Sequence, residues 1–226
     1  MATVPRELEA ARVLRDTVSA RPRRDRRVQL ACKRAMDIAI ALAAILVLGV
    51  PMLLIALAIR FDSRGPVILR QRRVKAHGAI FTFFKFRTMR ENADRLTHKI
   101  GLTNEHHGPI FKMRDDPRRT RIGKLLRKSS LDELPNLFDV LLGHMSIVGP
   151  RPPLPEEVAA YNARELRRLG VKPGMTGLWQ VSGRSLLSWD DTVRLDVEYI
   201  ETWSLWRDIV IIVRTLPAVI FARGAY

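Results

Sequence analysis

Two adjacent carboxylates lie among cations near the middle of the chain. Asp132 and Glu133 follow Arg127 and Lys128, and Arg151 comes later in a proline-rich stretch. A carboxylate that is ionised at neutral pH can act as a nucleophile or as a ligand of a hard metal ion. Cations around it can neutralise an anionic substrate. These residue types at this spacing therefore indicate chemistry on an anion, with Asp132 and Glu133 at its centre.

The helix expected to carry these carboxylates begins just before them. Ser130 and Glu133 have the spacing of a capping box, which predicts a helix over residues 131–143 that ends at Gly143. Both carboxylates would lie in its first turn, where the helix dipole favours their ionised form. Acidic residues are also common in first turns because they stabilise the helix, so this segment alone leaves a purely structural role open.

Positive charge is the strongest feature of the composition. The chain has 226 residues and a formal net charge of +16. Such a charge favours polyanionic partners, namely nucleic acid, an anionic membrane leaflet or a phosphorylated substrate. The single cysteine, Cys32, excludes an internal disulfide framework and a cysteine-based zinc site. His98, His106 and His107 lack the spacing of metal ligands, so we interpret them as scattered.

A basic segment and then an apolar one open the chain. We interpret residues 1–30 as a basic arm that is either solvated or in contact with lipid. Residues 38–59 carry no charge and are long enough to cross a bilayer as a helix. Cations on both flanks favour two cytoplasmic ends, and Pro51 near the middle would kink the helix. We therefore predict a re-entrant helical hairpin over residues 31–60, with a kinked membrane span as the alternative.

An acidic residue lies at the edge of this apolar segment. Asp37 follows Lys33 by four residues and Arg34 by three. An acid in this position would be costly without a partner, so we expect an ion pair with one of these bases and an anchoring role.

The remaining residues, 61–226, are predicted to form one domain. Strands are expected over 67–74 and 79–87, with a turn between them. Lys85 on the second strand is interpreted either as a surface cation or as a positioned anion binder. Helices are expected over 90–99, 118–128, 156–169, 189–199 and 205–221, with loops over 101–108 and 172–184. Arg184 in the second loop is a candidate ligand for phosphate, while the last helix could pack in the core or lie at a membrane interface.

Several short motifs in order along the chain resemble one known family. They are Lys33-Arg34-x-x-Asp37, Lys85-Phe86-Arg87-Thr88-Met89, Leu131-Asp132-Glu133-Leu134-Pro135-Asn136, Gly149-Pro150-Arg151-Pro152 and Pro173-Gly174-Met175-Thr176-Gly177. From about residue 30 onwards the chain resembles the bacterial sugar transferase family, the monotopic polyprenyl-phosphate phosphoglycosyl transferases. It is similar in particular to small members of exopolysaccharide production that act on UDP-hexoses. The resemblance favours galactose or glucose as the hexose.

The resemblance implies a reaction and assigns roles to residues. UDP-hexose and undecaprenyl phosphate would give undecaprenyl-diphosphate-hexose and UMP, with Mg²⁺ as the cofactor. Asp132 would be the nucleophile that forms a covalent phosphosugar intermediate, and Glu133 would share the metal with it. The cations implied to bind phosphate are Lys85, Arg127, Arg151 and Arg184, and Asp196 is implied as another polar residue of the site. The enzyme would lie on the cytoplasmic face of the bacterial inner membrane and contact anionic lipids.

The expected fold class is α+β and mostly helical. A re-entrant membrane helix would adjoin a cytoplasmic, membrane-associated domain with a small β-hairpin. The alternative is a membrane-tethered protein that binds nucleic acid or acts as a scaffold, for which the positive charge would be the attraction. The sequence contains no helix-turn-helix or other nucleic-acid reader motif, so no nucleic acid is expected as a partner.

Overall fold

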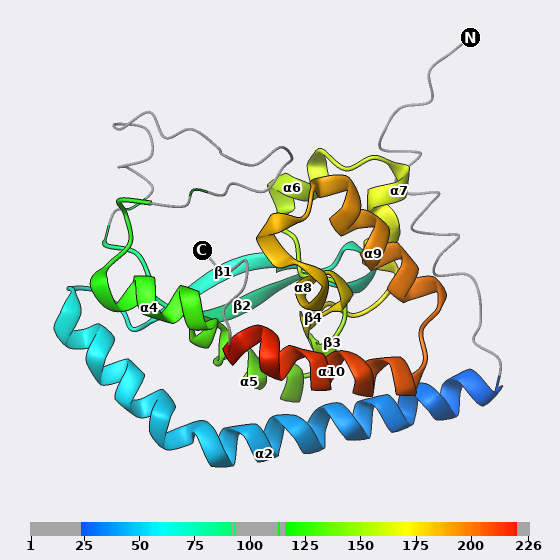
Figure 1. Cartoon of the computed structure of the whole chain (residues 1–226), viewed down its shortest axis with the longest axis horizontal. Coiled ribbons are helices and arrows are strands. Elements are labelled where there is room, and N and C mark those ends of the chain that lie inside the picture. Colours follow the sequence, from blue (N-terminus) through cyan, green and yellow to red (C-terminus); the bar gives the residue numbers. More distant parts are fainter. Residues whose placement is uncertain (1–23, 92, 94–112, 114–115, 221–226) are drawn as a thin grey trace, which may run out of the picture.

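The computed structural model of the chain describes residues 24–91, 93, 113 and 116–220. Within these residues the chain is mostly helical, as predicted, and has two small two-stranded sheets (Figure 1). Residues 1–23 of the predicted arm lie outside the described residues. So do the predicted loop 101–108, most of the predicted helix 90–99, and the three histidines at 98, 106 and 107.

Helix α2, Arg24–Asp62, contains the apolar segment. It is 39 residues long, and it is long and apolar enough to cross a membrane by length and composition. Its first residues belong to the segment 24–30 that was assigned to the basic arm. The helix continues through Pro51 and bends along its length, so the predicted hairpin is one bent helix (Figure 1). Proline removes one backbone hydrogen bond, and the alanines and leucines around it let the helix continue. Whether α2 enters and leaves a membrane by the same face stays a prediction.

Asp37 docks α2 onto the rest of the chain and does not form the predicted ion pair. Its buried carboxylate accepts hydrogen bonds from Ser146 Oγ and from the backbone N–H of Ile147, both at 3.0 Å. Lys33 instead donates to Asp208 Oδ2 at 2.6 Å. Sequence spacing places Asp37 near Lys33, but partners more than 100 residues away satisfy each of them in the fold.

The first sheet confirms the predicted hairpin. Strand β1, Ile68–Val74, pairs antiparallel with β2, Ile80–Phe86, across the short 3-10 helix η1, Ala76–Gly78. The register pairs Ile68 with Phe86 and Val74 with Ile80, so Lys85 lies opposite Leu69. Phe81, Phe83 and Phe86 are buried, which fixes β2 against the core.

A second sheet was not predicted. Strand β3, Ser146–Val148, pairs parallel with β4, Gly174–Thr176. Strand β4 lies within residues 172–184, which were expected to form a loop. Strands of three residues are too short to show a period of two, which explains why the sequence pattern missed them.

The parallel pair requires glycine where its backbones meet. A Cβ at Gly174 would lie 2.0 Å from the backbone nitrogen of Gly149, so Gly174→Ala forces the two segments apart. Overpacking of this kind costs about 1–3 kcal/mol, or a fall in Tm of about 2–10 °C in a chain of this size. Thermal unfolding in detergent measures this fall in Tm. Gly49→Ala is the control, because nothing lies within 4 Å of its Cβ in α2. An equal change in both variants would contradict the prediction.

The remaining helices are mostly short. They are α4 (Arg121–Ser129), η2 (Leu131–Glu133), α5 (Asn136–Leu141), α6 (Pro155–Ala159), α7 (Ala163–Leu166), η3 (Arg167–Gly170), α8 (Leu178–Ser182), η4 (Arg184–Leu186), α9 (Trp189–Glu201) and α10 (Leu205–Ile220). The structure confirms α9 and α10. The predicted helix 156–169 is broken into α6, α7 and η3, because Asn162 and Glu165 form a new capping box that restarts the helix. Helix α4 begins later than predicted, and Thr120 caps it.

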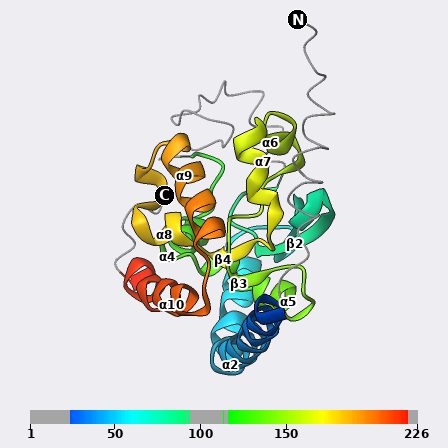
Figure 2. The same ribbon diagram turned by 90° about the vertical axis from the view of Figure 1, so that its right-hand side faces the viewer.

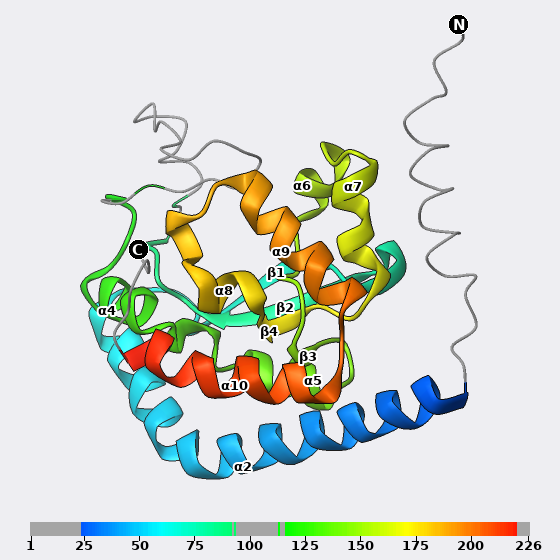
Figure 3. The same ribbon diagram turned by 45° about the vertical axis from the view of Figure 1, so that its right-hand side comes forward.

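Two helices lie along one edge of the molecule. Helices α2 and α10 run along the same edge in three views, while α6, α7 and α9 lie on the side away from it (Figures 1, 2 and 3). Between these layers a core forms around Val140, Met145, Val148 and Ile211, each at most 1% exposed. The connection from α4 to α5, which carries the paired carboxylates, lies beside this core.

Candidate functional site

One cavity of about 660 Å³ brings most of the predicted site residues together. Its lining includes Lys85, Arg127, Asp132, Glu133, Arg151 and Arg184. These side chains come from β2, α4, η2, the segment after β3, and η4, which are far apart in the sequence. The fold therefore places the carboxylate pair and all four predicted phosphate-binding cations around one space.

The carboxylates lie on a turn and not at the start of a helix. Ser130 closes α4 in the left-handed conformation, with φ of 58°, and its side chain makes no capping hydrogen bond. Residues 131–133 form the 3-10 helix η2, and a regular helix resumes at Asn136 after Pro135. The predicted capping box is wrong because the N–H of Ser130 bonds to the carbonyl of Arg127 and so ends the preceding helix. Cations, and not a helix dipole, provide the positive field at Asp132.

Asp132 is nearly enclosed, with 8% of its surface exposed. Burial and the neighbouring carboxylate of Glu133 raise the pKa of Asp132 to about 6, while Lys85 and Arg127 act in the opposite direction. The carboxylate is therefore mainly ionised at neutral pH. It is poorly solvated, which favours its reaction with an electrophile that the same cations can hold.

Lys85 faces this carboxylate from the hairpin. Burial and the nearby Arg127 lower its pKa to about 8, and Asp132 opposes that shift. The ammonium group thus lines a cavity and does not lie on an open surface, which favours the anion-binding interpretation of Lys85.

Hydrogen bonds hold two of the cavity arginines in place. Arg127 Nε donates to Thr88 Oγ1 at 3.1 Å, and Arg151 Nη1 donates to Glu157 Oε2 at 3.2 Å. Arg184 has a left-handed backbone, with φ of 53°, and its buried Nη1 has no hydrogen-bond partner among the described residues. An anionic oxygen in the cavity would satisfy that donor.

The sequence prediction missed Arg73. This buried guanidinium also lines the cavity, and burial together with Arg151 lowers its pKa to about 9. It donates to Gln71 Oε1 at 2.8 Å and to the carbonyl of Pro152 at 2.9 Å. Alternation along β1 was the available signal, since Gln71 and Arg73 share the face opposite to the exposed Arg72. Arg118 also lines the cavity and was not identified as a site residue.

Asp196 does not line this cavity. It is 1% exposed and accepts a hydrogen bond from Arg168 Nε at 2.8 Å. The Arg168 guanidinium lies over the rings of Tyr161 and Trp189, with its Cζ atom 5.6 and 5.0 Å from their centroids. Burial raises the pKa of Asp196 to about 6 although Arg168 opposes the shift. The structure therefore places Asp196 in a buried ion pair behind the cavity wall.

The paired carboxylates fit one kind of metal site. Among the described residues there is no group of three or more His, Cys, Asp or Glu side chains that could hold a metal ion. Mg²⁺ in phosphoryl-transfer sites is usually bound by one or two carboxylates together with substrate phosphates and water. Asp132 and Glu133 match that donor set and do not match a cage made of protein alone.

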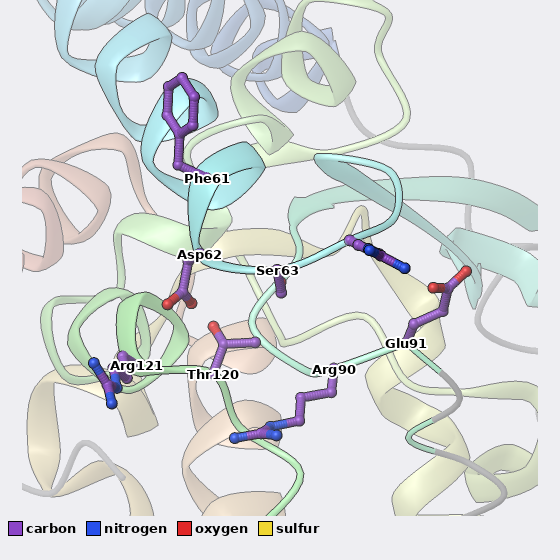
Figure 4. A pocket seen from close by; sticks show the side chains of 8 residues that line it. Phe61, Asp62, Ser63, Arg90, Glu91, Thr120 and Arg121 are labelled. Atoms are coloured by element: carbon purple, nitrogen blue, oxygen red, sulfur yellow. The ribbon is translucent and has the colours of Figure 1, made fainter.

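A second cavity, of about 520 Å³, lies at the end of α2. Figure 4 shows its side chains coming from the end of α2, from the segment after β2 and from the start of α4. Asp62 in its wall accepts a hydrogen bond from the backbone N–H of Ile122 at 3.2 Å. This cavity contains none of the predicted site residues.

Comparison with known proteins gives a consistent result. The sequence matches the model of a family described as bacterial sugar transferase over residues 28–222. It is 47% identical over 197 residues to the galactosyl transferase CpsE of Streptococcus agalactiae, covering 87% of this chain and 44% of CpsE. It is 41% identical over 198 residues to the exopolysaccharide production protein ExoY of Sinorhizobium fredii, covering 86% of this chain and 88% of ExoY. It is 40% identical over 202 residues to the undecaprenyl-phosphate galactose phosphotransferase of Salmonella typhimurium, covering 86% of this chain and 41% of that protein. The chain thus spans less than half of the first and third relatives and most of the second.

Proposed function

The chain belongs to the bacterial sugar transferase family, and from this premise we propose that it transfers hexose-1-phosphate from a UDP-hexose to undecaprenyl phosphate and releases UMP. Family membership confirms the predicted enzyme class, a sugar transferase. The observation that carries the proposal is the buried carboxylate of Asp132 in a cavity lined by Lys85, Arg127, Arg151 and Arg184. The product would begin the membrane-bound synthesis of an exopolysaccharide repeat unit.

The first step forms a bond to Asp132. A carboxylate oxygen of Asp132 attacks the phosphorus that carries the hexose, and the bond from this phosphorus to the bridging oxygen of the diphosphate breaks. UMP leaves with that electron pair. Attack by an anion on a diphosphate meets charge repulsion, so cations must neutralise the phosphoryl oxygens. Lys85 and Arg127 are suited to this because both oppose the raised pKa of Asp132 and so lie close to its charge.

The second step releases the sugar phosphate to the lipid. A phosphate oxygen of undecaprenyl phosphate attacks the phosphorus bonded to Asp132, the bond to the carboxylate breaks, and Asp132 is ionised again. Two displacements at one carboxylate allow a soluble nucleotide and a lipid phosphate to use the same site in turn. The same cations serve both steps, because each step places a phosphoryl group next to Asp132.

Asp132 and Glu133 would hold Mg²⁺. When bound, the ion supplies additional positive charge that neutralises the substrate's phosphate oxygens. Glu133 is more exposed than Asp132, and its carboxylate accepts no hydrogen bond from the described residues, so it can bind the ion without losing one.

Contacts at both ends of α2 support a re-entrant arrangement at the cytoplasmic face of the inner membrane. Near the start, Lys33 bonds to Asp208, and near the end Arg87 Nη2 donates to the carbonyl of Ser63 at 2.7 Å. Because both ends of the helix contact the same domain, we expect them to lie on the same side of the bilayer. Exposed leucines along the middle of α2 would enter the hydrocarbon, and the net charge of +16 would attract anionic lipids.

Thiol labelling tests this topology. Cys32 near the start of α2 is exposed, and a second thiol introduced by Arg64→Cys lies just beyond its end. We expect a membrane-impermeant maleimide to label both only when it reaches the cytoplasmic side, in inverted vesicles. Cys32→Ser provides the control for each site. Labelling of one thiol in intact spheroplasts would mean that α2 spans the membrane.

The rate of the first step should fall at both low and high pH. Asp132 must be ionised to attack, and its pKa of about 6 means that kcat/KM for UDP-hexose falls as pH drops below that value. Lys85 must be protonated to bind phosphate, and its pKa of about 8 means that kcat/KM falls again above that value. Lys85→Arg should remove the fall of kcat/KM at high pH, because a guanidinium stays charged. A profile that is flat from about pH 5 to 9 would contradict both assignments.

UMP release from a panel of UDP-hexoses tests the function. Detergent-solubilised protein is assayed with and without undecaprenyl phosphate and Mg²⁺. Lipid-dependent release of UMP from one sugar supports the proposal and identifies the hexose. Failure with every sugar, together with salt-sensitive binding to duplex DNA, would favour the nucleic-acid-binding alternative.

A further inference from the structure

Two guanidiniums on the lining of the main cavity lie close together. Arg73 of β1 donates from Nη1 to the carbonyl of Pro152 at 2.9 Å, and Pro152 directly follows Arg151 in the chain. Both arginines line the cavity. Burial and the charge of Arg151 lower the pKa of Arg73 to about 9. Because the two positive charges repel each other, the fold must hold both side chains in place.

Glu157 of α6 provides the counter-charge for this arginine pair. Its carboxylate is buried and accepts a hydrogen bond from Arg151 Nη1 at 3.2 Å. The same charge opposes the fall in the pKa of Arg73. Glu157 also accepts from the backbone N–H of Leu154 at 3.0 Å, which caps α6. A cap requires only this last bond, so capping does not account for the contact with Arg151.

Each arginine keeps N–H groups that bond to none of the described residues. A guanidinium has five N–H groups. In Arg73, Nε and Nη2 donate to Gln71 Oε1 at 3.2 and 2.8 Å, and Nη1 donates once to Pro152. This leaves an N–H on Nη1 and another on Nη2. Arg151 donates to the described residues only from Nη1. The pair therefore has donors available for an anion in the cavity.

The cations of the cavity divide between the two carboxylates. Lys85 and Arg127 act on Asp132, whose raised pKa they oppose. Of these two carboxylates, it is Glu133 whose charge opposes the fall in the pKa of Arg73. A UDP-hexose also has two phosphoryl groups, of which one reacts with Asp132 and the other leaves on the nucleotide. The arginine pair is therefore suited to the leaving phosphate.

We infer that Arg73 and Arg151 bind the phosphate group that leaves with UMP. Gln71 and Glu157 are positioning residues that hold these two guanidiniums. This inference rests on the proposed function and adds Arg73 to it as a catalytic residue. When the bond to the bridging oxygen breaks, negative charge develops on the phosphate of UMP, and two fixed guanidiniums stabilise it. Glu157 offsets one of the two buried positive charges, so both arginines can stay charged.

Nucleotide binding tests the role of Arg73 without turnover. Arg73→Gln should weaken the binding of UMP by at least about tenfold, because a charge-assisted hydrogen bond is lost. The binding of uridine should stay unchanged, because uridine has no phosphate. Isothermal titration calorimetry in detergent measures both. Arg72→Gln is the matched control, since Arg72 is the exposed neighbour of Arg73 on β1. Equal affinity for UMP in wild type and Arg73→Gln, or no binding of UMP to wild type, would overturn the inference.

A second substitution covers the case in which Arg73→Gln does not fold. Arg73→Lys keeps the buried positive charge but replaces a planar fork of donors by a single ammonium group. It cannot bond to Gln71, to Pro152 and to a phosphate in the same arrangement, so UMP should again bind more weakly while uridine binding is unchanged. Thermal unfolding shows whether the variant is folded. Folded Arg73→Lys with the UMP affinity of wild type would remove Arg73 from the site.

A double-mutant cycle tests Glu157. Glu157→Gln keeps an acceptor for the N–H of Leu154 but removes the negative charge, so kcat/KM for UDP-hexose should fall about tenfold in folded protein. Glu156→Gln, at the exposed neighbouring position, should behave as wild type. Because Glu157 acts through Arg151, Glu157→Gln should cause no further loss in protein that carries Arg151→Gln. Additive losses, or wild-type kinetics of Glu157→Gln, would overturn the positioning role.

These measurements separate the arginine pair from the proposed reaction. UMP binding that depends on Arg73, in protein that transfers no sugar phosphate from any UDP-sugar, would support the phosphate site and reject the reaction. Lipid-dependent turnover with equal UMP affinity in wild type and Arg73→Gln would support the reaction and reject the phosphate site.

Discussion

Asp132→Asn is expected to lower the rate of hexose-phosphate transfer by at least about 1000-fold, since loss of a catalytic nucleophile has effects of this size or greater. The amide has nearly the shape of the carboxylate but cannot donate an electron pair to phosphorus in the same way. Folding should be preserved, because the buried carboxylate is held in an environment that raises its pKa to about 6 and so disfavours its charge. UMP release measures the rate, and circular dichroism with membrane flotation measures folding and membrane association.

A second measurement makes the assignment specific. With UDP-hexose labelled in the sugar and no lipid acceptor, wild type should retain label on the protein after acid quenching, and Asp132→Asn should retain none. Asp190→Asn on the exposed start of α9 is the control and should behave as wild type. Turnover by Asp132→Asn within about tenfold of wild type would remove Asp132 from the role of nucleophile.

Arg168→Met is expected to destabilise the fold by about 3–5 kcal/mol, which is the usual cost of leaving one partner of a buried ion pair alone. The Asp196 carboxylate would then lie 1% exposed without its counter-ion. Chemical denaturation in detergent micelles measures the free energy of unfolding. The loss should be smaller at pH 5 than at pH 8. Burial already raises the pKa of Asp196 to about 6, so a proton bound in the folded state removes the unpaired charge at the lower pH.

A surface ion pair provides the control for this prediction. Arg194 and Asp191 form a pair on α9 with side chains 57% and 45% exposed, so Arg194→Met should leave the free energy of unfolding nearly unchanged.

The variant Asp196→Asn distinguishes a structural role of Asp196 from a catalytic one. If Asp196 acts only through the fold, the protein that remains folded should keep its kcat. A large fall in kcat at unchanged stability would return Asp196 to the site.

Sequence patterns predicted the parts of this protein that depend on local spacing. The uncharged run of residues 38–59 predicted a long apolar helix, and two strand-like segments around the turn at residues 75–78 predicted the hairpin of β1 and β2. Contiguous motifs identified the family and selected the carboxylates and cations that line the cavity. Each of these signals is contained in a short segment, so its interpretation did not require knowledge of what packs against it.

Tertiary structure decided the features that depend on distant partners. Sequence spacing predicted that Asp37 pairs with Lys33, but in the fold Asp37 accepts from Ser146 and Lys33 donates to Asp208, and both partners lie more than 100 residues away. Asp196 matched a site motif, but Arg168 holds it in a buried pair.

The same distinction applies to the carboxylates themselves. Their identity and their cationic neighbours could be read from the sequence, but the turn that carries them could not. Ser130 and Glu133 match a capping box, yet Ser130 closes the helix before it, since its own N–H completes α4. The sequence therefore identified the carboxylate pair and four of the cations that line the cavity, and it missed Arg73. Only the fold decided which of them share one cavity and which apolar helices enclose it, because burial and distance are properties of the packed chain.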